Sequence, residues 1–176
     1  MKKQIRKGVF ETNSSSTHAI CIATDDVLNI PKEIHFGFDN FGWECDTHSS
    51  LRAKASYLYT CLPYVAEDYN TLQQYLTFIY NTLKSHGVKN IYMDNFEIGV
   101  GTWGDDILFY TQPANDCYVD HGNEAEEFVK AVCTDEDKLL HYLFSNKSYV
   151  ETGNDNDDDD VEIHVDYPHD EYYKWN

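Results

Sequence analysis

The chain has 176 residues, 41% of them hydrophobic and 15% aromatic, which suits one folded domain and excludes an intrinsically disordered chain. No apolar stretch approaches the roughly 18 residues of a membrane span, and the N-terminus lacks the apolar region of a signal peptide. The five cysteines include no CxxC pair, which argues against a disulfide framework or a structural zinc site and favours a soluble protein of a reducing compartment.

The negative charge is confined to the second half of the sequence. Residues 1–93 contain nine acidic and nine basic residues, whereas residues 94–176 contain 22 acidic and four basic residues, and the net charge is −18. A surface of this charge repels nucleic acid and attracts cations or basic protein surfaces. We therefore expect no direct binding of DNA or RNA by the second half.

Hydrophobic alternation predicts strands at 3–10 and 17–23, joined by a hairpin-like turn over 11–16. In the second strand His18 shares a face with Ile20 and Ile22. A third strand is predicted at 32–36, before a loop rich in glycine and aromatic residues.

Two helices follow, because one apolar stripe runs from Leu51 to Val65 and another from Leu72 to Leu83. We expect Pro63 to bend or end the first helix. Asn70 with Gln73 resembles a capping box for the second, and residues 84–87 resemble its C-terminal stop.

The second half continues with strands at 88–93 and 106–111, then helices at 122–133 and 134–145, the latter capped by Thr134. A closing hairpin is predicted from 148–152 and 161–165. This order favours an α+β fold, a single domain over 1–165 with a mainly antiparallel sheet and about four helices packed on it. Residues 166–176 are predicted to form a polar and aromatic C-terminal tail.

The first candidate site is the turn between the two N-terminal strands. Its small polar side chains leave backbone N–H groups exposed, and successive N–H groups can hold an anion such as phosphate. The alternative is an ordinary solvated turn. The residues of this candidate phosphate site are Arg6, Thr12, Asn13, Ser14, Ser15, Ser16 and His18, with Asn154 and Asp155 from a later turn.

His18 adds a second question, because a histidine on a buried face must satisfy both ring nitrogens. A hydrogen-bonded Ser–His pair is the first interpretation, an anion site the second, and a catalytic serine a distant third, since the chain has no GxSxG motif. An enzyme acting on phosphate esters would use Ser14, Ser15, Ser16, His18, Asp120 and His121.

The sequences CYVDHG (117–122) and VETGNDND (150–157) place polar residues next to predicted strands. We expect them to meet the serine-rich turn at one edge of the sheet. His18, Asp120, His121 and Asp155 would then suit a divalent metal or a phosphate ester. Helix capping and turn formation are the alternative for these residues. Apart from this divalent metal, no cofactor is predicted.

An acidic segment interleaved with aromatic residues is the candidate surface for a basic protein partner. It consists of Asp157, Asp158, Asp159, Asp160, Glu162, Asp166, Asp170, Glu171, Tyr172 and Tyr173. The run of aspartates lacks the ligand spacing of an EF-hand, so a calcium loop is not predicted.

Residues 6–20, RKGVFETNSSSTHAI, resemble the opening of a group of small proteins from phages, prophages and Gram-positive bacteria. The resemblance implies a mobile-element protein that works in the bacterial cytoplasm, and it assigns no catalytic roles. Many small phage proteins inhibit host defence, and several of those inhibitors are strongly acidic, which is an analogy of class only.

Three functions stay open at this stage. The favoured one is an anti-defence inhibitor, similar to anti-CRISPR proteins, that blocks a basic nucleic-acid-handling protein such as a nuclease. The second is an enzyme or binding protein for phosphate esters or nucleotides. The third is an acidic globular protein whose polar clusters are structural. The sequence does not predict an oligomeric state.

Overall fold

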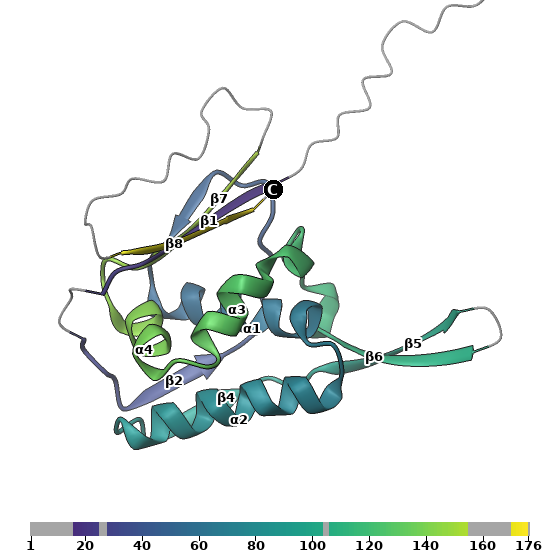
Figure 1. Ribbon diagram of the computed structural model, residues 1–176, viewed down its shortest axis with the longest axis horizontal. Helices are drawn as coiled ribbons and strands as arrows, with labels where there is room; N and C mark the ends of the chain where they lie inside the picture. Colours follow the sequence, from purple (N-terminus) through teal and green to yellow (C-terminus); the bar gives the residue numbers. More distant parts are fainter. Residues whose placement is uncertain (1–15, 25–27, 104–105, 155–169, 176) are drawn as a thin grey trace, which may run out of the picture.

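The computed structural model describes residues 16–24, 28–103, 106–154 and 170–175 (Figure 1). The strands predicted at 3–10 and 161–165 and most of the turn at 11–16 lie outside these residues. Within them the fold is α+β, with four α-helices, a four-stranded antiparallel sheet and two smaller sheets, as the element order predicts.

The main sheet places the strand of His18 at its centre. Strand β1 (Ser16–Ile22) lies between β7 (Tyr149–Asn154) and β8 (Glu171–Trp175), and β3 (Asp46–His48) lies outside β7. All three pairings are antiparallel. Every residue of β1 is buried, and neighbouring strands cover both of its edges.

Two small sheets lie outside the main one. Strands β2 (Glu33–Phe36) and β4 (Asn90–Met93) pair in parallel, joined by a crossover that contains the first two helices. Strands β5 (Glu97–Trp103) and β6 (Asp106–Gln112) form an antiparallel hairpin that projects away from the rest of the molecule in Figure 1.

The four helices are α1 (Leu51–Val65), α2 (Tyr69–Ser85), α3 (Glu126–Val132) and α4 (Glu136–Phe144), with short 3-10 helices at Ala114–Asp116 (η1) and Gly122–Ala125 (η2). Helix α1 is the centre of the core, since ten of its residues are buried. The main sheet lies on one side of the α1–α3–α4 layer, and α2 with β2 lies on the other (Figure 1).

Local signals explain where α1 begins and ends. The Ser50 hydroxyl accepts a hydrogen bond from the Ala53 N–H, which satisfies one of the free amides of the first turn. Pro63 lies inside the helix, which ends two residues later at Val65 rather than at the proline. This placement sets Tyr57 in the middle of the helix, facing β1.

Several sequence predictions need correction. The N-cap of α2 is Asp68, which accepts from Thr71 N, and not Asn70. The N-cap of α4 is Asp135, while the Thr134 hydroxyl donates back to Lys130 O. Strand β5 was not predicted, because its glycines interrupt the apolar pattern.

The predicted C-terminal tail also needs correction over its described part. Residues 171–175 form β8 and pair with the central strand β1, so this part of the chain belongs to the domain rather than to a tail. The sequence did not predict this strand because its pairing partner β1 is distant in the chain. Alternation within a segment does not show which other strand the segment pairs with. Among the described residues, no helix has the length and apolar character to cross a membrane.

Candidate functional site

His18 lies at the centre of the main sheet and both of its ring nitrogens are hydrogen-bonded. It pairs in register with Thr152 of β7 and Trp175 of β8, and its side chain is fully buried. Its Nε2 lies 2.9 Å from the Ser16 hydroxyl, and its Nδ1 lies 2.9 Å from the Tyr57 hydroxyl of α1. The ring stacks on Trp175, with 5.7 Å between ring centroids and 8° between planes. The predicted Ser–His pair is therefore present and involves Ser16.

Asp120 joins this pair from a different part of the chain. The segment before η2 runs beside Phe41, with Asp120 N donating to Phe41 O at 2.8 Å. The carboxylate accepts hydrogen bonds from the side chain and backbone N–H of Ser16 and from Trp43 Nε1 at 3.0 Å. Burial raises the pKa of Asp120, but the hydrogen bonds from Trp43 and Ser16 and the nearby His121 outweigh it, and the pKa is lowered. Asp120 is thus held as a carboxylate.

These contacts link four side chains in one line. The Tyr57 hydroxyl lies against His18 Nδ1, and His18 Nε2 lies against the Ser16 hydroxyl. The Ser16 hydroxyl in turn faces the Asp120 carboxylate. A neutral imidazole donates from one ring nitrogen and accepts at the other, so His18 makes one hydrogen bond of each kind. We call this line of contacts the Tyr57–Asp120 network.

The burial of this network bears on the catalytic interpretation of Ser16. A nucleophile must reach its substrate, whereas Ser16 is fully buried and its hydroxyl lies between His18 and Asp120. The geometry therefore favours the hydrogen-bonded structural pair over a catalytic serine.

The same contacts show the surroundings of one member of the predicted phosphate site. The hydroxyl and backbone N–H of Ser16 face the carboxylate of Asp120, which Trp43 also binds. A second anion beside this carboxylate would be repelled. The residues that precede Ser16 in the predicted site lie outside the described part of the chain, so the phosphate site as a whole stays a prediction.

The expected convergence of three polar segments occurs in part. Ser16 of β1 lies opposite Asn154 of β7 in register, and Asp120 lies beside Ser16. His121 adopts a left-handed backbone conformation with φ of 53°, and its Nδ1 lies 3.1 Å from Glu124 Oε1. Its imidazole is thus paired with a residue of η2.

Many predicted site residues lie outside the described part of the chain. From the candidate phosphate site these are Arg6, Thr12, Asn13, Ser14, Ser15 and Asp155, and from the candidate partner surface Asp157, Asp158, Asp159, Asp160, Glu162 and Asp166. The remaining partner residues, Asp170, Glu171, Tyr172 and Tyr173, lie in or next to β8 at the edge of the main sheet.

Burial controls the protonation of His18. Removal of the ring from water lowers its pKa from 6.5 to about 4, which Asp120 partly opposes and His121 and His48 reinforce. His18 is therefore neutral near pH 7, so that one of its ring nitrogens donates in the Tyr57–Asp120 network and the other accepts. Within the ranges that the structure describes, no three histidine, cysteine or acidic side chains are grouped as a metal site.

Three members of this site were not identified from the sequence. Tyr57 lies in an apolar stretch of α1, Trp43 lies in a glycine-rich loop, and Trp175 lies in the segment interpreted as a tail. None has a local motif, because each is brought to His18 or Asp120 by tertiary packing. The one sequence signal was the buried face that His18 shares with Ile20 and Ile22, because a buried imidazole needs hydrogen-bond partners.

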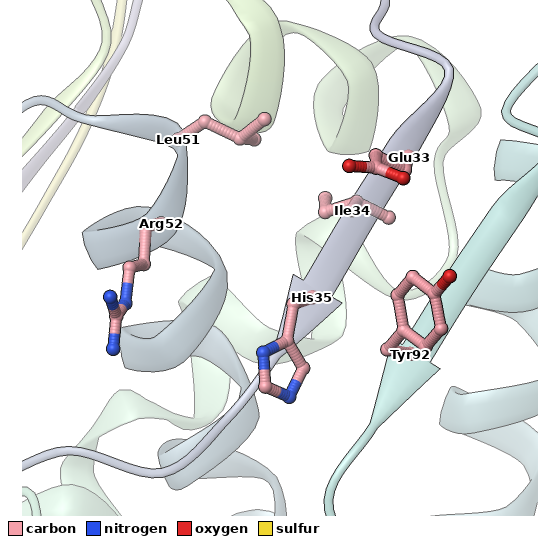
Figure 2. Close-up of a pocket in the computed structure, with 6 residues that line it drawn as sticks. All are labelled: Glu33, Ile34, His35, Leu51, Arg52 and Tyr92. Atoms are coloured by element: carbon pink, nitrogen blue, oxygen red, sulfur yellow. The ribbon is translucent and has the colours of Figure 1, made fainter.

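A separate open groove lies beside β2, at the start of α1 (Figure 2). It has a volume of about 470 Å³ and is lined by Glu33, Ile34, His35, Leu51, Arg52 and Tyr92. His35 Nε2 lies 2.9 Å from Asp94 Oδ1, which holds the imidazole at the groove. Its lining combines acidic, basic and apolar groups, and it contains no residue of the Tyr57–Asp120 network.

Comparison of the chain with protein-family models, with curated proteins and with solved structures gave no match.

Proposed function

We propose that this protein binds the basic, nucleic-acid-binding surface of another protein and blocks it, with a bacterial defence nuclease as the target. The observation that supports the proposal is the separation of charge along the chain, with 22 acidic and four basic residues after residue 93. The Tyr57–Asp120 network offers less support for an enzyme, because Ser16 is buried and faces the carboxylate of Asp120.

Within the described part of the second half, several acids lie on and between two neighbouring helices. Six exposed carboxylates lie on η2, α3, the connection to α4 and the first turn of α4, and we call them the α3–α4 acidic surface. Its members are Glu124, Glu126, Glu127, Asp135, Glu136 and Asp137. Lys130, the basic residue within this stretch of sequence, already pairs with Glu126.

The acidic surface continues onto β8. Burial raises the pKa of the Tyr173 hydroxyl, and the carboxylates of Glu171, Glu127 and Asp135 raise it further. Three acidic groups from β8, α3 and the start of α4 therefore act on one hydroxyl. Lys138 forms an ion pair with Glu171 at 2.8 Å, so one basic residue is neutralised at this junction.

An electronegative surface of this kind suits a protein that normally binds DNA. Duplex DNA carries one charge about every 1.7 Å of its axis, and the proteins that bind it offer lysine and arginine side chains to those charges. Closely spaced carboxylates satisfy the same side chains but offer no phosphodiester bond to cleave. The resemblance of residues 6–20 to phage and prophage proteins supports the bacterial cytoplasm as the place of action and defence nucleases as the first targets to test.

The proposal predicts that charge reversal on the α3–α4 acidic surface weakens inhibition. With purified bacterial defence nucleases and a fluorescent DNA duplex, wild-type protein is expected to displace the duplex at low salt. The double variant Glu127→Lys, Glu136→Lys is expected to need at least about tenfold more protein, because each change replaces an attraction by a repulsion.

The matched control is Glu33→Lys, Glu97→Lys, which changes the net charge equally through exposed residues of β2 and β5. It is expected to displace DNA within about twofold of the wild type. If both double variants lose the ability to displace DNA equally, only the net charge matters. If neither variant loses it, the proposal is contradicted. Thermal unfolding of both variants checks that each is folded.

A further inference from the structure

An exposed aromatic pair lies directly above the Tyr57–Asp120 network. Trp43 is 55% exposed and Tyr118 is 43% exposed. Gly42 lies between them: a Cβ atom at Gly42 would lie 3.3 Å from the Tyr118 hydroxyl, and Trp43 is the next residue in the chain. The two rings therefore belong to one surface.

The Trp43 ring and the backbone of Tyr118 are held in position before any partner binds. Trp43 Nε1 donates to Asp120 Oδ2 at 3.0 Å, and Asp120 is itself held by buried Ser16. Tyr118 N donates to Asn40 Oδ1 at 3.2 Å, and its carbonyl accepts from Phe41 N at 2.9 Å. Rings that are already ordered lose little conformational entropy when a partner binds.

Carboxylates lie beside the same rings. Glu44 is exposed, and its Oε2 accepts from Gly42 N at 3.2 Å. Asp120 lies beside Trp43 with a lowered pKa and is ionised at neutral pH. In the described part of the chain, Lys130 and Lys138 form ion pairs, and neither pairs with Glu44 or Asp120. The negative charge of this surface is thus not neutralised by those lysines.

From these observations we infer that Trp43, Glu44, Tyr118 and Asp120 form a docking site for an arginine side chain of a basic protein partner. We call these four residues the Trp43 surface. A guanidinium is planar, so it stacks on an aromatic face and donates to a carboxylate in its own plane, whereas a lysine ammonium does not stack. Tryptophan, tyrosine and arginine are also the residues that dominate binding energy at protein interfaces.

This inference rests on the proposed function and makes it more specific. The α3–α4 acidic surface attracts any cation, and it does not distinguish arginine from lysine. The Trp43 surface adds a preference for arginine. Selectivity between two peptides of equal charge therefore tests the inference, while the binding of both peptides tests the charge on which the proposed function depends.

The experiment measures binding of octa-arginine and octa-lysine to the full-length protein by isothermal titration calorimetry at low salt. Wild-type protein is expected to bind octa-arginine at least about fivefold more tightly than octa-lysine. Trp43→Gln keeps an N–H donor for Asp120 but removes the ring, and Tyr118→Ala removes the other ring. Each is expected to reduce this preference to about twofold or less.

The control variant is Tyr69→Ala, which removes a 63% exposed ring from the start of α2. It is expected to keep the wild-type preference. If both peptides bind the wild type equally, or if the preference survives in both Trp43→Gln and Tyr118→Ala, the inference is wrong while the charge-based proposal stands. If neither peptide binds the wild type, both are wrong.

Discussion

Replacement of His18 by leucine is expected to lower the free energy of unfolding by about 3 kcal/mol. The change removes the hydrogen bonds that His18 makes to the buried hydroxyls of Tyr57 and Ser16. Each buried polar group that loses its partner costs about 1–3 kcal/mol, and leucine does not restore the stacking on Trp175. Urea denaturation at pH 7, followed by circular dichroism, measures the difference.

His35→Leu is the matched control, because it also exchanges a histidine on a strand for leucine. The side chain of His35 is 56% exposed and its partner Asp94 is 48% exposed. Its loss is expected to cost less than about 0.5 kcal/mol. If His18→Leu were as stable as His35→Leu, the Tyr57–Asp120 network would not be an important part of the fold.

The second expected result is a loss of stability in mild acid that depends on His18. Burial lowers the pKa of His18 to about 4 in the folded protein, against 6.5 for a histidine exposed to water. As the pH falls from neutral, the unfolded chain therefore binds a proton that the folded protein resists, and this favours unfolding. Stability is expected to fall by about 1.4 kcal/mol per pH unit in the window between these pKa values, up to about 3 kcal/mol in total.

The measurement is urea denaturation at several pH values between 7 and 4, for the wild type and for His18→Gln. Glutamine does not titrate, so the variant keeps the contribution of all other groups and loses that of His18. The pH slope of the variant is expected to be smaller, even if its stability at pH 7 is lower. Parallel slopes for the two proteins would contradict a buried neutral His18.

Much of the fold follows from local sequence patterns. The apolar stripe from Leu51 to Val65 predicts α1 with its observed bounds, and the alternation around Ile20 predicts β1. The position of β8 does not follow, because its sequence, EYYKW, is weakly alternating and its place in the sheet depends on a free edge of β1. Helix caps were misplaced by one or two residues, since several polar residues precede each helix.

The candidate site was predictable only where the partners are close in sequence. Ser16 and His18 are two residues apart on one strand, so their pairing follows from strand alternation. Tyr57 and Asp120 reach them through the packing of α1 and of the segment beside Phe41, which no local pattern encodes. The carboxylate that faces Ser16 was not predictable for the same reason, because it lies about a hundred residues away.

The most direct test of the proposed function asks whether this protein and DNA can occupy a defence nuclease together. Mass photometry of the nuclease, a DNA duplex and this protein in low salt resolves the binary and ternary complexes. We expect two binary complexes and no ternary one, with the affinity for this protein falling steeply as salt is added. A stable ternary complex, or an affinity that is independent of salt, would contradict the proposal that its acidic surface takes the place of DNA.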